Sequence, residues 1–145
     1  MSRSPSRRLF AIVAAAVLSL PGCIASNVVA PEQRFVVTDT TELKFTAAPG
    51  LLLDGLFESV EITGDAALSL RKVYYLFAAD GTYTAAALAE VDGKAAFQTL
   101  QGTWNSTAAG LSLDGADPVQ LEQAQNHVRI TAPTGALVLR KGSLQ

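Results

Sequence analysis

Turn-forming dipeptides divide this chain into short pieces, and their spacing constrains the fold more than any other feature. They occur at Pro49-Gly50, Gly64-Asp65, Asp80-Gly81, Asp92-Gly93, Asp114-Gly115 and Pro133-Thr134-Gly135. The runs between them are rich in Val, Thr, Tyr, Phe and Leu, and apolar residues alternate with polar ones. A period of two residues is typical of β-strands. The pattern therefore predicts an antiparallel all-β domain over residues 35–141, built as a small barrel, a meander or a sandwich.

The turn signals also give approximate strand positions. The expected strands are 35–38, 42–47, 57–63, 68–78, 82–91, 94–104, 111–113, 119–122, 127–131 and 136–141. Two stretches remain open between strand and helix. Leu51–Phe57 could begin with a helical turn, and Pro118–His127 could form a short helix that Asp117 caps.

Two Asp-Gly dipeptides set the expected pairing of Val73–Trp104. Asp-Gly favours two-residue hairpin loops, because both loop positions need a positive φ. The expected pairs about Asp92-Gly93 are Ala89 with Ala96, Ala87 with Gln98, Ala85 with Leu100 and Tyr83 with Gly102. Those about Asp80-Gly81 are Ala78 with Tyr83, Leu76 with Ala85 and Tyr74 with Ala87. A three-residue loop at either turn would shift this pairing.

This pairing places one set of residues on a common face, which we expect to be the core face: Tyr74, Leu76, Ala78, Tyr83, Ala85, Ala87, Ala89, Ala96, Gln98, Leu100, Gly102 and Trp104. Gln98 is its strongly polar member. Ligand cavities are mostly apolar with a few placed polar groups. The candidate ligand-binding residues are therefore Tyr74, Leu76, Ala85, Ala87, Gln98 and Leu100. Alternatively, the alanines let a facing element pack closely, and Gln98 is a satisfied interior residue.

The first 23 residues carry an export signal. Arg3, Arg7 and Arg8 precede Leu9–Leu20, an apolar run too short to span a bilayer as a helix. Leu20-Pro21-Gly22-Cys23 follows and resembles the lipobox of bacterial lipoproteins, with an apolar residue at −3, a small one at −1 and Cys at the new N-terminus. The resemblance implies a signal peptide over 1–22, lipidation of Cys23 and a tether over 23–34.

Lipidation would attach the protein to a membrane. Two or three acyl chains on Cys23 would anchor it durably, since each buried CH₂ contributes about 0.8 kcal/mol. Ile24 stands where Asp is associated with inner-membrane retention in some bacteria. We therefore expect a cell-envelope protein, anchored in the outer membrane and facing the periplasm or on the outer face of the cell. A simple secretory signal that leaves Cys23 as a free thiol is the alternative.

The central part of the chain resembles the small lipocalin-like barrels of bacterial lipoproteins. The resemblance lies in the run Tyr-x-Phe-x-x-Asp-Gly-Thr-Tyr at 75–83, in Gly102-Thr103-Trp104, and in the short apolar strand Leu111-Ser112-Leu113 that follows. It implies a small closed barrel whose interior is either filled by side chains or hollowed for a ligand.

Composition argues against several classes of function. Beyond the signal, eight Lys and Arg face 13 Asp and Glu, so we expect no nucleic-acid partner. With one Cys, one His and one Met, the chain lacks the usual ligand set for a zinc or copper site, and we expect no metal and no cofactor. His127 begins an expected strand, which indicates a solvated or strand-end histidine. There is no G-x-S-x-G elbow for a Ser-His-Asp arrangement.

Three hypotheses about function follow. In the first, a non-enzymatic barrel binds a small apolar ligand or an envelope component. In the second, the barrel is filled and an outer face contacts another envelope protein. In the third, the chain is a hydrolase of unrecognised type, which the missing motifs disfavour. A cavity along the predicted face would support the first hypothesis, and a filled interior with an exposed apolar patch would support the second.

Overall fold

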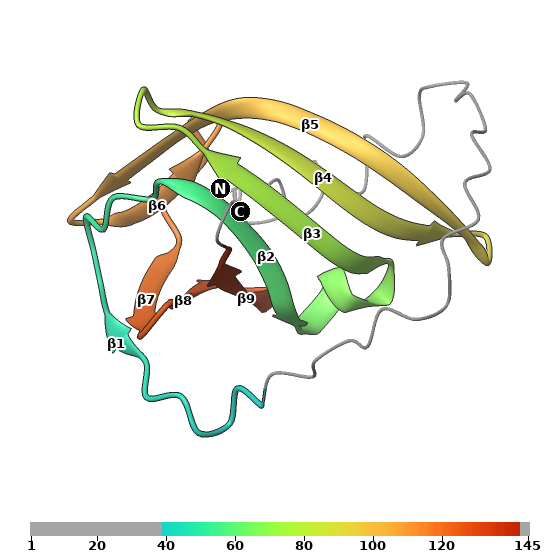
Figure 1. The fold of residues 1–145 in the computed structure, drawn as a ribbon, viewed down its shortest axis with the longest axis horizontal. Helices are drawn as coiled ribbons and strands as arrows, with labels where there is room; N and C mark the ends of the chain where they lie inside the picture. Colours follow the sequence, from blue (N-terminus) through green and yellow to red (C-terminus); the bar gives the residue numbers. More distant parts are fainter. Residues whose placement is uncertain (1–38, 143–145) are drawn as a thin grey trace, which may run out of the picture.

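The structure, a computed structural model, describes residues 39–142. These residues form nine β-strands in one curled antiparallel sheet, together with a short 3-10 helix (Figure 1). The strands are β1 (Thr46–Ala47), β2 (Gly55–Ile62), β3 (Leu70–Phe77), β4 (Thr82–Val91), β5 (Lys94–Thr107), β6 (Gly110–Leu113), β7 (Gln120–Ala124), β8 (His127–Ala132) and β9 (Gly135–Lys141). The 3-10 helix covers Gly64–Leu68. The predicted all-β class is confirmed.

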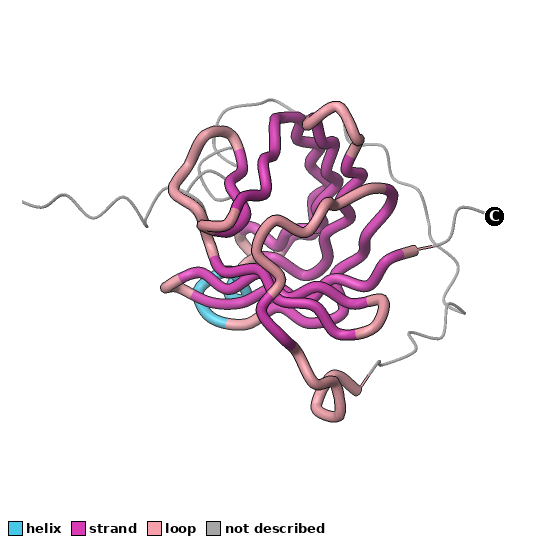
Figure 2. The backbone as a smooth tube through the Cα atoms, turned by 90° about the vertical axis from the view of Figure 1, so that its left-hand side faces the viewer, coloured by secondary structure: helices cyan, strands magenta, loops and turns pink. Residues whose placement is uncertain are grey.

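Most strands pair with their neighbours in sequence, and the last strand, β9, pairs with β2 near the beginning of the domain. Consecutive strands pair from β2 to β6 and from β7 to β9, and β9 then pairs with β2. The two runs meet where Leu111 and Val119 exchange two backbone hydrogen bonds, of 2.9 and 2.8 Å. The strands therefore wrap around a common interior, as Figure 2 shows. The turn spacing left a barrel, a meander and a sandwich open, and the structure is a meander curled into a small, partly open barrel.

The hairpin at Asp92-Gly93 has the predicted register. Asp92 and Gly93 both have positive φ, 51° and 72°, as a two-residue loop requires. The four pairs expected across this loop are all present: Ala89 with Ala96, Ala87 with Gln98, Ala85 with Leu100 and Tyr83 with Gly102. The sequence therefore predicted both the pairing and the inward face of β4 correctly.

The register predicted at Asp80-Gly81 is wrong by one residue. The loop has three residues, because the N–H of Ala78 donates to the carbonyl of Thr82 at 2.9 Å, and Gly81 alone has positive φ, 86°. Asp80 stabilises this wider loop: its carboxylate accepts hydrogen bonds from the backbone N–H and the hydroxyl of Thr82, at 2.9 and 2.6 Å. A shift of one residue turns every side chain of β3 to the other face.

Several expected boundaries change. The expected strand 42–47 is reduced to β1, and the strand expected at 68–78 begins only after the 3-10 helix. The first open stretch contains no helical turn, and β2 starts at Gly55; the second forms β7 rather than a helix. The signal peptide (1–22), Cys23, the tether (23–34) and the strand 35–38 lie outside the described residues. Within residues 39–142, no helix reaches the length and apolarity of a membrane-crossing segment.

Candidate functional site

Four of the six predicted ligand-binding residues lie together on the inner face. Ala85 and Ala87 point inward from β4 and are 1% and 2% exposed. Leu100 and Gln98 lie opposite them on β5 and are half-buried. The two alanines belong to the hydrophobic core, and Leu100 packs against it. The structure therefore brings these four residues together, as the sequence predicted.

Tyr74 and Leu76 do not join this group, which corrects the predicted site. They lie on the outer face of β3 and are 39% and 46% exposed. Val73, Tyr75 and Phe77 face the interior in their place. The cause is the three-residue loop at Asp80-Gly81, which shifts β3 by one residue against β4. The sequence signal for this outcome is the Thr82 hydroxyl that follows Asp80-Gly81.

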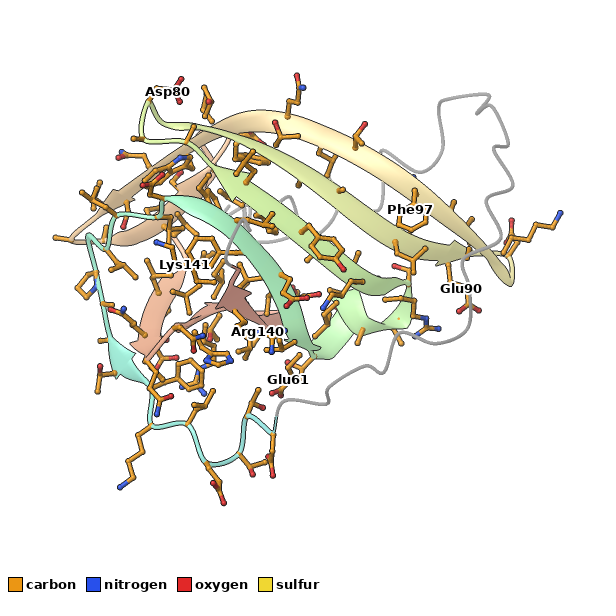
Figure 3. The ribbon with its side chains drawn as sticks, in the orientation of Figure 1. Glu61, Asp80, Glu90, Phe97, Arg140 and Lys141 are labelled. Atoms are coloured by element: carbon orange, nitrogen blue, oxygen red, sulfur yellow. The ribbon has the colours of Figure 1, made fainter. Side chains whose placement is uncertain are left out.

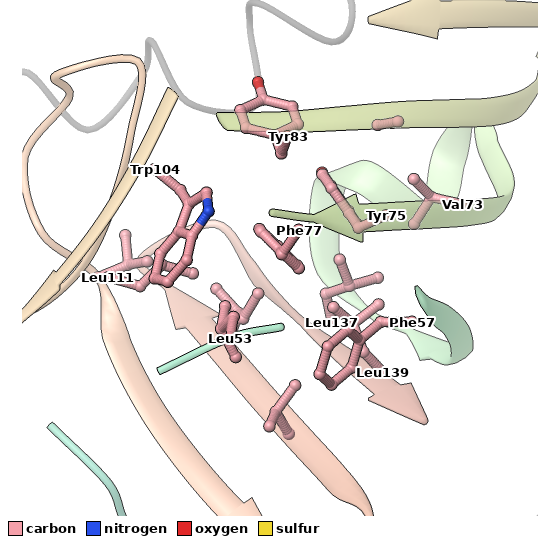
Figure 4. Close-up of a cluster of buried hydrophobic side chains, with 14 of the residues drawn as sticks. Leu53, Phe57, Val73, Tyr75, Phe77, Tyr83, Trp104, Leu111, Leu137 and Leu139 are labelled. Atoms are coloured by element: carbon pink, nitrogen blue, oxygen red, sulfur yellow. The ribbon is translucent and has the colours of Figure 1, made fainter. Parts of the chain in front are cut away.

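Aromatic rings fill the interior. Tyr75 and Phe77 stack at 5.3 Å between ring centroids, and Phe77 meets the edges of Phe57 and Trp104 at 5.7 Å each. Figure 4 shows these rings gathered in one cluster, with Leu53, Leu111 and Leu139 among them. All of these side chains are less than a tenth exposed. Around Phe77 and Trp104 the inner face of the barrel is therefore a packed core.

A polar anchor holds the aromatic cluster to the β5–β6 side of the barrel. The Tyr83 hydroxyl donates to Asp114 Oδ2 at 2.7 Å, and Asp114 Oδ1 accepts the Thr103 N–H at 2.9 Å. Burial, together with the Asp114 carboxylate, raises the pKa of Tyr83. Burial raises the pKa of Tyr75 to about 12. Both tyrosines are therefore neutral at any physiological pH, as expected for structural residues.

The outer face of three neighbouring strands carries an apolar surface. We call the set Tyr74, Leu76, Ala86, Leu88 and Phe97 the outer apolar patch. Tyr74 pairs with Ala86 and Leu88 pairs with Phe97, so the members are neighbours across β3, β4 and β5. Phe97 is 74% exposed and lies toward the turn that joins β4 to β5 (Figure 3).

Ion pairs border this patch. Lys72 bonds to Glu58 at 3.0 Å, with its ammonium 5.4 Å from the Tyr74 ring centroid. Arg71 bonds to Glu90 at 2.9 Å. An apolar centre within a charged rim is the composition of a protein-binding surface. This surface was not predicted from the sequence, because the expected register of β3 turned Tyr74 and Leu76 inward.

A hollow lies elsewhere on the outer face, between the N-terminal described segment and strands β2, β8 and β9. It has a volume of about 390 Å³ and is lined by Thr40, Thr41, Leu43, Phe45, Glu61, Thr63, Arg129, Ala136 and Val138. Its two charged residues have partners. Arg129 binds Glu122 at 2.6 Å and stacks over Phe45, and Glu61 accepts the Thr40 hydroxyl. Both charged side chains that line the hollow are therefore already hydrogen-bonded within the protein.

His127 begins β8, as predicted, but it is buried rather than solvated. It is 5% exposed, and neither ring nitrogen has a hydrogen-bond partner among the residues that the structure describes. Burial lowers the pKa of His127, and the nearby Arg140 lowers it further. A general base needs an orienting partner and access to substrate. His127 has no such partner within 39–142, and this stretch holds no group of three His, Cys, Asp or Glu residues placed to bind a metal ion.

Comparison with known proteins adds no relative. No family model matches the chain, and neither a curated protein nor a solved structure matches it.

Proposed function

We propose that this chain is an exported lipoprotein whose β domain is a non-catalytic binding module for another component of the cell envelope. In this proposal the domain binds with its outer surface rather than with its interior. The observation that carries it is the orientation of the β3 side chains. Tyr75 and Phe77 fill the interior, while Tyr74 and Leu76 lie on the outer face beside Phe97. A filled interior with an exposed apolar patch is the arrangement that the interaction hypothesis requires.

The anchor part of the proposal rests on the lipobox. Lipidation of Cys23 would hold the domain at a membrane, by expectation the outer membrane on its periplasmic side. Residues 24–38 would separate the anchor from the first described residue, Asp39. Chain covers at most about 3.3–3.6 Å per residue, so this length limits the distance between the anchor and Asp39 to about 50 Å.

The anchor gives the first testable prediction. Cys23→Ser should move the protein from the membrane fraction to the soluble fraction, or leave its signal peptide uncleaved, because no thioether can form at serine. The measurement is membrane fractionation with intact-mass analysis of the mature chain. Ser26→Ala, three residues away, is the control and should leave fractionation unchanged. Unchanged fractionation of Cys23→Ser, with cleavage at a bond other than 22–23, would contradict the anchor.

The chemistry of the patch indicates its partner. Tyr74, Leu76 and Phe97 supply aromatic and aliphatic area, and the charges at the rim are already paired with one another. Such a surface fits a protein partner with an apolar centre, since aromatic residues dominate the energetics of interface cores. A charged polymer or a nucleic acid would find no free cationic patch there.

Site-directed photocrosslinking in cells tests the binding surface. A photoreactive phenylalanine analogue at position 97 or 74 should give a discrete crosslinked band that contains a protein other than this chain. The same analogue at Gln123, exposed on β7 beyond the patch, should give none. Crosslinking that is equal at all three positions would contradict the proposal.

A second candidate function keeps the interior in use. Gln98 and Leu100 are only half-buried on the inner face of β5, beside the buried Ala87. This favours a small apolar ligand in the part of the barrel that lies between Trp104 and the Asp92-Gly93 turn. Mass spectrometry of the purified chain distinguishes the two candidates. A stoichiometric co-purifying lipid, with no crosslink at position 97, would favour the ligand-binding function.

A further inference from the structure

The first half of β5 has a neighbour on one side only. β4 pairs with β5 along Lys94–Thr103, whereas β6 pairs only with its last four residues, Trp104–Thr107. Figure 1 shows β5 at the margin of the sheet, with β6 beside its C-terminal end. No other described strand lies against the remaining length, so Ala95–Gly102 is a long open sheet edge.

Hydrogen bonds at Thr103 show which backbone groups face this edge. The carbonyl of Thr103 accepts from the N–H of Asp114, and its own N–H donates to the Asp114 carboxylate. Both bonds are on the side away from β4. Because successive residues of an antiparallel strand alternate in direction, Gln101, Thr99, Phe97 and Ala95 direct their N–H and C=O groups to the same side. All four residues are exposed, and nothing in 39–142 hydrogen-bonds to these eight groups.

This edge lacks the features that normally protect one. Natural edge strands carry charged residues, proline or a bulge that prevents further pairing. From Ala95 to Leu113 the sequence has no charged residue and no proline. The pairing of β5 with β4 is continuous over ten residue pairs, without a bulge. The edge is therefore long, regular, neutral and ready to accept another strand.

We propose that a second copy of this chain occupies the edge, by antiparallel pairing of β5 with β5 about a two-fold axis at Gln98. This axis sets Phe97 of one copy opposite Thr99 of the other, and Ala95 opposite Gln101. All eight outward backbone groups of each copy then find partners. An axis at Phe97 or at Thr99 would leave one of the four residues unpaired, so the register at Gln98 is the one that satisfies the edge completely.

Side chains fit self-pairing as well. In an antiparallel isologous pairing the residues near the axis lie close to their own copies, so charges there would repel each other, whereas Ala95–Gly102 carries no charge. On the inner face, Leu100 lies opposite the small Ala96 of the other copy, and the two Gln98 amides meet on the axis. On the outer face, the two Phe97 rings are diagonal neighbours, about 7–8 Å apart at Cα, which is within aromatic reach. The inference goes beyond the proposed function and needs neither the membrane anchor nor an envelope partner.

Charge introduced at the edge provides the first test. Sedimentation or light scattering of the purified full chain should show a concentration-dependent dimer. Thr99→Lys should raise its dissociation constant about tenfold or more, because the two lysines face each other diagonally across the axis. Thr84→Lys is the matched control: Thr84 is also an exposed threonine on the outer face of this hairpin, but it lies on the interior strand β4. Its dissociation constant should match that of the native chain.

A disulfide provides the second test and fixes the register. In a Cys23→Ser background, Gln98→Cys should oxidise to a covalent dimer, because directly opposed residues of this type have Cα atoms about 4.5 Å apart. Gln101→Cys should not, since its two copies would lie about 20 Å apart along the strands.

Each other outcome overturns the proposal. A native chain that stays monomeric does so, as does a dimer that Thr99→Lys and Thr84→Lys affect equally. A disulfide at position 101 but not at 98 would refute the pairing about Gln98. Dimerisation that begins only after residues 24–38 are deleted would assign the edge to the chain's own N-terminal segment instead of a second copy.

Discussion

Replacing Trp104 with alanine is expected to lower the free energy of unfolding by about 3–5 kcal/mol. Trp104 is 8% exposed, and its ring meets Phe77 edge-on at 5.7 Å. Its indole N–H donates to the carbonyl of Ala78 at 2.9 Å, which ties β5 to the loop before β4. Alanine would leave a cavity in the aromatic cluster and deprive the Ala78 carbonyl of its partner.

Chemical denaturation followed by far-UV circular dichroism measures this effect. Tryptophan fluorescence is unsuitable, because Trp104 is the chain's only tryptophan. Phe97→Ala is the matched control, since it also removes an aromatic ring from β5 but at a position that is 74% exposed; it should change stability by about 0.5 kcal/mol or less. Similar losses for Trp104→Ala and Phe97→Ala would contradict the burial of the indole. Trp104→Phe separates the ring from its hydrogen bond and should cost less than alanine.

The contrast between the two Asp-Gly hairpins shows how far local sequence determines this fold. At Asp92-Gly93 the dipeptide forms the two-residue loop that it favours, and every predicted pair is present. At Asp80-Gly81 the same dipeptide forms a three-residue loop, which is stabilised by hydrogen bonds from the Thr82 backbone N–H and hydroxyl to the Asp80 carboxylate. Lys94, the residue after the other dipeptide, has no hydroxyl to do the same.

Core packing also favours the three-residue loop at Asp80-Gly81 and the register of β3 that it produces. The observed register buries Tyr75 and Phe77, which contact Tyr83 and Trp104, whereas the predicted register would have buried Tyr74 and Leu76. From Val73 to Phe77 every residue of β3 is apolar or aromatic, so either face could be the buried one. Periodicity alone could therefore not choose between the two registers. The candidate site could therefore be predicted for β4 and β5 but not for β3.

Contacts between distant parts of the chain were also beyond local patterns. His127 is buried at a sheet position opposite Arg140 of β9, a pairing between separate strands that the local sequence does not give. The pairing of Leu111 with Val119, which joins β6 to β7, follows from the curvature of the whole sheet. The open edge of β5 follows from a difference in strand length, since β5 has 14 residues and β6 has four.

The junction between β6 and β7 leads to the second large expected effect. Gly110 precedes Leu111 and has a φ of +124°, a conformation that side chains rarely adopt. A Cβ at this position would lie 2.2 Å from the carbonyl oxygen of Val119, the atom that accepts the Leu111 N–H. Gly110→Ala must therefore both strain the backbone and push β7 away from β6.

We expect Gly110→Ala to lower the free energy of unfolding by about 3 kcal/mol or more. Backbone strain accounts for about 1–3 kcal/mol of this, and the two lost backbone hydrogen bonds for about 1 kcal/mol each. Chemical denaturation measures the total, and amide hydrogen exchange at Leu111 and Val119 reports on the junction itself. Both amides should exchange faster in the variant than in the native chain.

Gly115→Ala separates the two contributions. Gly115 also has a positive φ, +71°, but a Cβ there would meet no heavy atom within 4 Å. It should cost only the conformational penalty of about 1–2 kcal/mol and leave exchange at the junction unchanged. If Gly110→Ala proved no more destabilising than Gly115→Ala, the close approach of β6 and β7 would not be stabilising the barrel. The larger loss at Gly110, with fast exchange at Leu111 and Val119, would instead establish that this one pair of residues closes the curled sheet.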